Sequence, residues 1–410
     1  MEIIADLHIH SRFSRATSPQ LTIPNLEKWA KVKGLDLLGT GDFTHPLWLK
    51  ELKQELKEKE GILKTKTGFP FILQAEISLM YTQDKKGRRV HLLLLAPSFE
   101  VVEQINNYLG EKGRLDYDGR PIFGMNCIEF TEAIKEISDD IEVIPAHAWT
   151  PWFGVFGSKS GFDSVEECFQ DQAKHIYALE TGMSADPAMF WRLSKLDKYT
   201  TISNSDSHSH WPWRLGREAN VFELDEINYR NIVNTIRTRQ IKETIEVDPA
   251  YGKYHYDGHR LCNFSCSPKE AEDKYKNICP VCKKQLTIGV EHRVEELADR
   301  ELGFRPPKAT PFRKLLPLHE IIANLFRVQL YSKRAWREYD LLIDYFKNEF
   351  NVLLKAHPLD LARVTDDRIV QAIIKNRQGK IKVKPGYDGL YGEMVLEDSF
   401  GEKQKRLFDI

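Results

Sequence analysis

Histidines and carboxylates recur through the first half of this 410-residue chain, at positions that could bind metal ions. His8 and His10 come first, separated by one residue. Alternate side chains of a β-strand face the same side, so both imidazoles would point at one spot and could share an ion. A lone pair of this kind is as often structural. Similar residue types follow at Asp42, His45, Glu76, His91, His147, Asp206 and His208.

These scattered residues are expected to meet, because they lie in or just after apolar runs that predict strands. The carboxyl ends of parallel strands in a barrel open at one mouth. Nitrogen and carboxylate ligands suit Zn, Mn, Fe or Mg, and the set exceeds what one ion needs. We therefore expect two or three divalent ions, Zn, Mg or Mn, with Glu76 as the bridging carboxylate. Asp42 could only orient a histidine, and His45 could lie away from the ions. Satisfied core histidines are the opposing interpretation.

A centre of this kind is suited to phosphoester hydrolysis. Clustered metal ions can lower the pKa of bound water toward neutrality and hold the non-bridging oxygens of a phosphate. No side-chain nucleophile is then required. Within the set, we expect the catalytic contribution from Glu76, His147, Asp206 and His208.

Short apolar runs alternate with helical patterns over residues 1–250. Strands are expected at residues 3–9, 35–40, 71–79, 90–96, 141–146, 176–180 and 200–203. Helices are expected to begin after Pro24, near Pro46 (through Lys59), after Ser98, and at Glu129, Asp163, Asp186 and Asp225. Most of these starts carry the Pro, Ser or Asp that favours a helix N-terminus. About seven strand–helix units predict an α/β fold, a parallel sheet most simply closed into a TIM-type barrel ending near Pro249.

Four of the six cysteines fall close together, at Cys262, Cys266, Cys279 and Cys282. Paired thiols at this spacing predict one structural zinc ion in a small module over residues 251–292. Either His255 or His259 could replace Cys266 as a ligand. Cys127 and Cys168 stand alone and are expected in the core.

The remaining chain is predicted to be a mainly helical C-terminal domain over residues 293–400, followed by a tail over 401–410. After a proline-broken linker, helices are expected at residues 318–333, 335–354 and 366–376, then a short hairpin or loop at 380–397. Residues 1–250 carry 30 Lys and Arg against 37 Asp and Glu, whereas residues 251–410 carry 29 against 23. The net negative charge of residues 1–250 fits cation binding, and the net positive charge of residues 251–410 fits a polyanion. Such charges are also common on solvated surfaces.

Several aromatic and basic residues could contact DNA. Aromatic faces stack on bases and arginines bind phosphates, so loops of this composition beside a metal centre suit an extruded nucleotide. The alternative is that the tryptophans only pack the loops. The candidates are Arg12, Arg15, Trp149, Trp152, Lys159, Trp211, Trp213, Arg214, Lys380, Lys382 and Lys384.

Other classes of protein are disfavoured. Hydrophobic residues make up 41% of the chain and charged residues 29%, which is typical of a folded globular protein rather than a disordered one. No apolar run is long enough to cross a bilayer, which needs about 20 residues. The first residues lack the pattern of a signal peptide, so we expect a cytoplasmic protein without a membrane partner.

The ordered set of histidines and acids over residues 1–250 resembles the PHP superfamily of metallohydrolases. That resemblance implies a distorted seven-stranded, TIM-like (β/α)7 barrel with a three-metal site. Many members carry a further histidine shortly after the first pair, where this chain reads Ser-Arg-Phe-Ser-Arg-Ala at residues 11–16. The departure could place Arg12 or Arg15 against a phosphate.

The later motifs narrow the resemblance. Gly-Lys-Tyr-His-Tyr-Asp-Gly-His-Arg-Leu-Cys at residues 252–262, Cys-Pro-Val-Cys at 279–282 and Pro-Gly-Tyr-Asp-Gly-Leu-Tyr-Gly at 385–392 make the chain similar to the endonuclease Q family over nearly its full length. That family, archaeal with some bacterial members, nicks double-stranded DNA on the 5′ side of deaminated bases (uracil, hypoxanthine, xanthine) and abasic sites, leaving a 3′-hydroxyl and a 5′-phosphate. The resemblance therefore implies a nucleoid-associated DNA repair enzyme.

Two other functions compete with this one. A small-molecule phosphomonoesterase of the histidinol-phosphatase type would share the barrel and metals but has no use for the last 160 residues. A catalytically inactive scaffold could bind DNA or a polymerase. The tail begins like a sliding-clamp peptide at Gln404 and Leu407 but lacks the usual aromatic pair.

Overall fold

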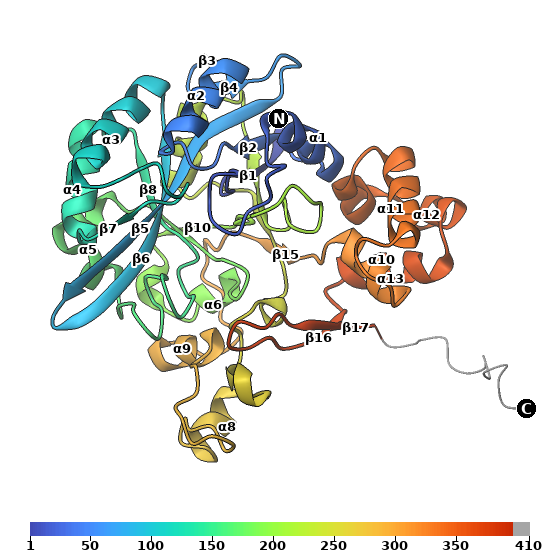
Figure 1. Ribbon diagram of the computed structural model, residues 1–410. Helices are drawn as coiled ribbons and strands as arrows, with labels where there is room; N and C mark the ends of the chain where they lie inside the picture. Colours follow the sequence, from blue (N-terminus) through green and yellow to red (C-terminus); the bar gives the residue numbers. More distant parts are fainter. Residues whose placement is uncertain (397–410) are drawn as a thin grey trace, which may run out of the picture.

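The computed structural model describes residues 1–396 of the chain and builds its first two thirds around a closed ring of strands (Figure 1). The ring follows the order of the sequence: β1 (Glu2–Asp6), β2 (Leu37–Gly39), β5 (Pro70–Gln83), β6 (Lys86–Ala96), β8 (Glu142–Pro145), β9 (Ala178–Glu180) and β10 (Thr200–Ile202). Runs such as Leu-Leu-Leu-Leu in β6 are apolar throughout because both faces of that strand are buried.

Backbone hydrogen bonds close the ring at the carboxyl ends of the last strands. Ala148 N donates to Glu180 O at 2.9 Å, which links the end of β8 to β9, and Thr181 N donates to Ile202 O at 2.9 Å, which links β9 to β10. The chain then returns to β1 through the bridge between Ile9 and Ser207. The mouth of the barrel therefore lies at the strand ends that carry the histidines and acids. The chain has the PHP-like mixed α/β fold, with a helical C-terminal region, that the sequence predicts.

The sheet is not wholly parallel, and here the prediction needs correction. β1, β2 and β5 run parallel, as do β9 and β10, but β5 pairs with β6 and β6 pairs with β8 in antiparallel ladders. Only Asp84 and Lys85 separate β5 from β6, both with positive φ. A two-residue turn of this kind matches the twist of a hairpin and leaves no room for a crossover helix. Two unpredicted strands, β11 (Ala219–Glu223) and β12 (Glu243–Glu246), extend the sheet beyond β1.

Helices cover the outside of the ring (Figure 1). They are α1 (Ile23–Lys33), α2 (Pro46–Glu55), α3 (Phe99–Lys112), α4 (Cys127–Ile137), α5 (Val165–Phe169), α6 (Pro187–Phe190) and α7 (Tyr229–Arg237). Side-chain caps at Ser98, Asn126 and Asn228 start three of them. The predicted extension of α2 to Lys59 is wrong, because residues 57–59 form β3 (Lys57–Lys59), which turns through Glu60 and Gly61 into β4 (Ile62–Lys64).

Two smaller parts follow the barrel. The first contains β13 (Asp257–His259), β14 (Phe264–Cys266) and α8 (Pro268–Asp273), and α9 (Val290–Leu297) connects it to the barrel. The second contains α10 (Leu318–Leu325), α11 (Lys333–Phe346), α12 (Pro358–Val364) and α13 (Asp367–Arg377), with the hairpin of β16 (Lys382–Lys384) and β17 (Glu393–Val395). β15 (Phe312–Lys314), in the linker between the two, joins the barrel sheet beside β12.

Three details of the helical part differ from the prediction. The helix expected over residues 318–333 ends at Leu325, the next one ends at Phe346, and α12 was not anticipated. None of the helices among residues 1–396 is both long enough and apolar enough to span a bilayer. The clamp-like peptide at residues 404–410 lies outside the described part of the chain.

Candidate metal centre

The predicted ligands meet at the barrel mouth in two groups that share one residue. Within each group, every residue offers a ligand atom that lies within 4.8 Å of the others. The first group holds His8, His10, Glu76 and Asp206, and the second holds Glu76, His91 and His147. They come from the ends of β1, β8 and β10 and from the middle of the β5–β6 hairpin.

The two carboxylate oxygens of Glu76 face different groups. Oε1 lies 2.7 Å from His91 Nδ1 and 3.1 Å from His147 Nε2. Oε2 lies 3.2 Å from His10 Nε2 and 3.6 Å from His8 Nε2. A carboxylate placed this way can bridge two cations, which is the role that the sequence predicts for it.

Bound metal ions would explain the arrangement of these nitrogen and oxygen atoms better than hydrogen bonds between them. His8 Nε2 is buried and has no hydrogen-bond partner among the described residues. His91 Nδ1 and His147 Nε2 point at each other across 3.2 Å, and at least one of these nitrogens must lack a proton to do so. A divalent cation would satisfy these nitrogens together with Glu76 and Asp206.

Opposing charges hold the central carboxylates ionised. Burial alone would raise the pKa of Glu76, but the charges of His91 and Arg120 outweigh it and hold the pKa well below the usual value. Burial also opposes ionisation of Asp206, yet its hydrogen bond from His10 and the charge of His208 keep its pKa well below the usual value. Both groups are therefore available as anionic ligands at neutral pH.

Two carboxylates orient the first histidine pair. Glu180, at the end of β9, lies 3.0 and 3.1 Å from His8 Nδ1, which leaves Nε2 free for the ligand group. Asp42 lies 3.0 Å from His10 Nδ1 in the same arrangement. Partners of this kind fix the tautomer of a metal-binding imidazole. Asp42 therefore orients a histidine, which is one of the two roles considered for it from the sequence. The sequence did not single out Glu180, although it ends a predicted strand as the other site residues do.

Three site residues have positive φ in a backbone region that non-glycine residues rarely adopt. The values are +42° for Asp42, +31° for His147 and +46° for Asp206. Each lies within four residues of the end of a strand of the ring, where the chain must turn sharply to aim its side chain into the mouth. Such conformations cost about 1–3 kcal/mol each and persist where the surrounding structure enforces them, often at functional sites.

Besides Asp42, two further predicted ligands stand outside the ligand groups. His45 stacks on Phe13 with ring centroids 4.4 Å apart. His208 lies at the mouth, its ring 4.4 Å from that of His10, with Nδ1 directed at the backbone oxygen of Asp206. His208 thus borders the first group, and its catalytic role stays a prediction.

A cavity of about 370 Å³ opens beside the second group. His91, His147 and Asp206 form part of its wall. Cations and aromatic rings from several elements complete it, namely Arg120, Trp152, Phe153, Arg217, Lys253, Tyr254 and Tyr391. Arg120, which donates to Glu76 Oε2 at 2.9 Å, was not anticipated, because it lies in an irregular loop without a motif. Tyr391 reaches the cavity from the motif at residues 385–392.

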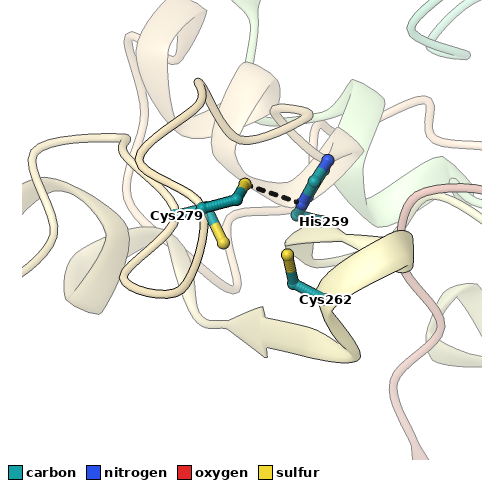
Figure 2. A group of neighbouring side chains, drawn as sticks. His259, Cys262 and Cys279 are labelled. Atoms are coloured by element: carbon teal, nitrogen blue, oxygen red, sulfur yellow. Dashed lines mark hydrogen bonds between the residues drawn. The ribbon is translucent and has the colours of Figure 1, made fainter.

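A separate metal-binding group lies in the module after the barrel. His259, Cys262, Cys279 and Cys282 offer ligand atoms within 4.8 Å of one another. Figure 2 shows the labelled side chains pointing toward a common centre, and Cys282 Sγ lies 3.3 Å from His259 Nδ1. Burial alone would raise the pKa of Cys279, but backbone N–H groups of Cys282 and Val281 lower it to about 7. A partly ionised thiol of this kind suits zinc.

Cys266 does not belong to this group, which corrects the predicted four-cysteine set. His259 takes its place, one of the two alternatives that the sequence left open. In the β13–β14 hairpin, Phe264 pairs with His259, while Cys266 pairs with Asp257 at the far end of the ladder. Cys266 therefore lies about 7 Å along the strand from Phe264, the residue that pairs with His259. It packs instead in a small core with Ala271 and Leu286.

Two solved structures match this chain along nearly its whole length. One is the lesion-specific endonuclease PfuEndoQ from Pyrococcus furiosus, with 32% sequence identity and a TM-score of 0.86 over 97% of this chain and 96% of that one. The other is an endonuclease Q in complex with a 27-mer duplex that carries an abasic lesion at the active site. It has 32% identity and a TM-score of 0.88 over 99% and 100% of the two chains. The chain belongs to the endonuclease Q family.

Membership makes the chain an enzyme, a metal-dependent nuclease. A family model named MJ0043 C-terminal domain matches residues 317–380, which contain α10 to α13. The uncharacterised protein MJ0043 of Methanocaldococcus jannaschii is 32% identical over 64% of this chain, a match that spans only 34% of that relative. The uncharacterised protein YqxK of Bacillus subtilis is 27% identical over 96% of this chain and 99% of its own length.

Two of the tryptophans predicted to contact DNA in this endonuclease Q family member are core residues. Trp149 is 1% exposed and packs on Phe156, and Trp213 is 2% exposed and stacks on Trp211. That part of the prediction is wrong, because Trp213 and Trp211 fill the contact between the barrel and α11, where Trp336 meets both.

The other candidates are more accessible. Trp152 lines the cavity. Several of the cations already have acidic partners: Arg12 pairs with Glu51, Arg15 with Asp118, Arg214 with Glu320 and Lys384 with Glu393. The exposed lysines are Lys159, Lys380, Lys382 and Lys384, of which Lys382 and Lys384 lie in β16.

Proposed function

We propose that this enzyme nicks double-stranded DNA on the 5′ side of deaminated bases and abasic sites, leaving a 3′-hydroxyl and a 5′-phosphate. Uracil, hypoxanthine and xanthine are the bases concerned. The observation that carries the proposal is the pair of ligand groups joined by Glu76 beside a cavity lined by cations and aromatic rings. A small phosphomonoester would need neither the aromatic wall nor the two further parts of the chain.

The side chains around the metal centre have different roles. Bound divalent ions would activate water and stabilise the negative charge that develops on the phosphate. Glu76, His147 and Asp206 would hold them, while Glu180 and Asp42 keep the first histidines in the binding tautomer. Arg120 reaches Glu76 from the cavity wall, so its other guanidinium nitrogens can bind a phosphate oxygen.

The cavity would receive the nucleotide that leaves the stack. Its volume lies in the range of small-molecule sites, about 300–1,000 Å³. Trp152 and Tyr254 offer ring faces for stacking, and Lys253 and Arg217 offer charge for the phosphates. Extrusion costs least for a poorly paired or missing base, and this contributes selectivity.

Outside the barrel, the zinc group at His259, Cys262, Cys279 and Cys282 would stabilise its module without taking part in the chemistry. The lysines of β16 lie on an exposed strand and would contact the DNA backbone. Together the two parts would hold the duplex on either side of the metal centre.

The test is nicking of end-labelled duplexes that carry one uracil, one hypoxanthine, one abasic site or no lesion, each with Mg²⁺, Mn²⁺ or EDTA. We expect a metal-dependent nick immediately 5′ of each lesion. Asp206→Asn should lower the rate at least about 100-fold while lesion binding persists, because it removes one anionic ligand. Asp163→Asn, at an exposed acid outside the centre, is the control.

Two results would contradict the proposal. If every duplex stays intact while a small phosphomonoester is hydrolysed, the substrate is not DNA. If lesion DNA binds but no metal supports turnover, the barrel is an inactive scaffold.

A further inference from the structure

A single lysine connects two segments that line the cavity beside the metal centre. Lys314 Nζ lies 2.9 Å from Asp186 Oδ2 and 3.6 Å from Asp248 Oδ2. Asp186 is buried, and the other two side chains are each about one-third exposed. Within residues 1–396, neither aspartate forms an ion pair with any other cation. Because both carboxylates lie so close to one ammonium group, they would repel each other without it.

Asp186 anchors the turn that forms one wall of the cavity. Residues 182–184 follow strand β9 and line the cavity. Gly182 has a φ of +68°, and a Cβ built there would lie 2.6 Å from His147 Cβ, so this turn packs directly against a member of the second ligand group. Asp186 Oδ1 accepts a hydrogen bond from Met189 N at 3.1 Å and caps helix α6, which leaves Oδ2 for the lysine.

Asp248 anchors a second wall in the same way. Its Oδ1 accepts a hydrogen bond from Ala250 N at 2.9 Å and caps the short helix of residues 249–251. Lys253 and Tyr254 come shortly after this helix and line the cavity. Each aspartate therefore uses one oxygen to fix a wall of the cavity and the other oxygen to bind the lysine.

The second of these walls also includes Tyr391. Gly386 N donates to Ala250 O at 2.8 Å, and Gly392 N donates to Tyr251 O at 3.0 Å. Tyr391 lies between these two glycines in the sequence and lines the cavity. The backbone that the second aspartate anchors therefore also holds the loop of Tyr391 in place.

Strand β15 fixes the position of the lysine. Figure 1 shows β15 in the chain that runs from α9 to α10. Lys314 pairs with Glu246 in the parallel ladder between β15 and β12, and Leu315 N donates to Glu246 O at 2.8 Å. Burial alone would lower the pKa of Lys314, but the charges of Asp186 and Asp248 outweigh it and raise the pKa. The ammonium group is therefore charged at neutral pH and held in place by the barrel sheet.

We propose that Lys314 is a positioning residue that sets the distance between the two walls, and with it the fit of the extruded base. It binds both aspartates but is not itself among the described residues of the cavity wall. The base of a uracil or hypoxanthine nucleotide must fit between the walls, whereas an abasic nucleotide has no base to place. Lys314 therefore supports nicking at base-bearing lesions more than at abasic sites. The inference rests on the proposed function.

The first experiment compares Lys314→Met with Lys242→Met in the metal-loaded enzyme. Lys242 pairs with Glu2 on the surface at 2.7 Å, so its variant is the matched control for loss of a paired lysine. In Lys314→Met, kcat/KM should fall about 10- to 100-fold for duplexes with one uracil or one hypoxanthine, and less than about threefold for an abasic duplex, because misplaced walls no longer hold the base. The control should nick all three duplexes at the wild-type rate.

A second experiment removes the partner instead of the lysine. Asp186→Asn keeps a good cap for α6 but removes the charge that binds Lys314. It should lower the ratio of uracil to abasic nicking as Lys314→Met does, and the double variant should be no worse than Lys314→Met alone, because the two residues act through one contact. Lys314→Arg, which keeps the positive charge, should restore most of the nicking at uracil.

The ratio between lesions distinguishes positioning from a merely structural role. A lysine that only stabilised the fold would change all three substrates by one factor, in step with the melting temperature. If Lys314→Met does not fold, the ratios measured for Asp186→Asn and Lys314→Arg decide the question in its place.

The outcomes separate the two proposals. If wild type nicks every lesion duplex and the variants change uracil, hypoxanthine and abasic nicking equally or not at all, Lys314 does not set the fit of the base and the proposed function stands. If wild type nicks no lesion duplex, the proposed function fails, and this inference with it.

Discussion

At the scale of single residues, Glu180 governs the metal centre without joining either ligand group. Besides holding His8 Nδ1, it accepts a hydrogen bond from His147 N at 2.8 Å and one from Asn204 Nδ2 at 2.9 Å. Glu180 therefore fixes the side chain of His8, in the first ligand group, and the backbone of His147, in the second. We therefore expect a substitution of Glu180 to slow nicking by weakening metal binding.

Glu180→Gln should lower affinity for Mn²⁺ about 10- to 100-fold, because the loss of an orienting carboxylate weakens a histidine ligand. Calorimetric titration measures this directly, and a high Mn²⁺ concentration should restore nicking. Glu166→Gln, at an acid 49% exposed on the outer surface, serves as the control. Wild-type affinity in Glu180→Gln would show that His8 does not depend on this contact.

At the scale of elements, the β13–β14 hairpin decides which of its residues belong to the candidate zinc-binding group. His259 and Cys262 lie at the turn end and Cys266 at the open end. The turn faces the loop that carries Cys279 and Cys282, so sequence spacing between cysteines is a poor guide to the ligand set.

His259→Ala should release zinc and lower the melting temperature of the enzyme, because a closed structural site contributes folding energy. Cys266→Ser should keep its zinc and show at most a small loss from the buried hydroxyl. Metal analysis of both purified variants with thermal melting provides the check. Zinc loss in Cys266→Ser alone would restore the four-cysteine ligand set.

Strand β12 carries a carboxyl group whose burial makes stability depend on pH. Burial raises the pKa of Glu246 from 4.5 to about 8, against hydrogen bonds from Thr244, Ser203 and Thr181. The folded state therefore binds this proton more tightly than the unfolded chain, and stability falls as pH rises from about 4.5 to about 8.

Glu246→Gln should remove that contribution. The difference between the melting temperature of the variant and that of wild type should therefore rise progressively between pH 5 and pH 8. Scans across this range in one buffer series measure the difference. Glu226→Gln, at an exposed acid, should run parallel to wild type. A constant offset between Glu246→Gln and wild type would mean that Glu246 does not titrate in this window.

At the scale of the whole molecule, a buried ion pair joins the barrel to the C-terminal helices. Lys33 Nζ in α1 lies 2.7 Å from Glu349 Oε1, and both side chains are at most 1% exposed. Tyr339 donates to the other oxygen of Glu349 at 2.8 Å, and Leu318 N donates to Oε1 at 3.0 Å. With the tryptophans beside it, this network holds the helices in one position relative to the metal centre.

Lys33→Met should cost about 3–5 kcal/mol of folding free energy, because it leaves Glu349 buried without its counter-charge. The midpoint of urea unfolding measures the loss. Lys242→Met removes a lysine from an exposed pair with Glu2, and its midpoint should not move. If both variants unfold at the wild-type midpoint, the aromatic contacts alone join the two parts.

The sequence predicted the features that depend on local order along the chain. The alternation in His8-Ile-His10 predicted two imidazoles on one face, and the turn residues around each helix predicted the strand ends. Strand ends that meet at one barrel mouth bring the scattered ligands together, so the two ligand groups follow. The division into domains at residues 250, 292 and 400 stays a prediction, as do the catalytic role of His208 and the contacts of the exposed lysines. The hairpin turn at Asp84 and Lys85 has no strong sequence signal, so the antiparallel β6 was missed.

Tertiary structure alone decided which side chains face which. His45 carries the same chemistry as His91, yet it stacks on Phe13 because its loop turns away from the mouth. Trp149 and Trp152 differ by three positions, and one packs in the core while the other lines the cavity. Residue type and spacing determine what a side chain can do. Its partners come from strands that are distant in sequence, and only the folded chain sets the direction in which it points.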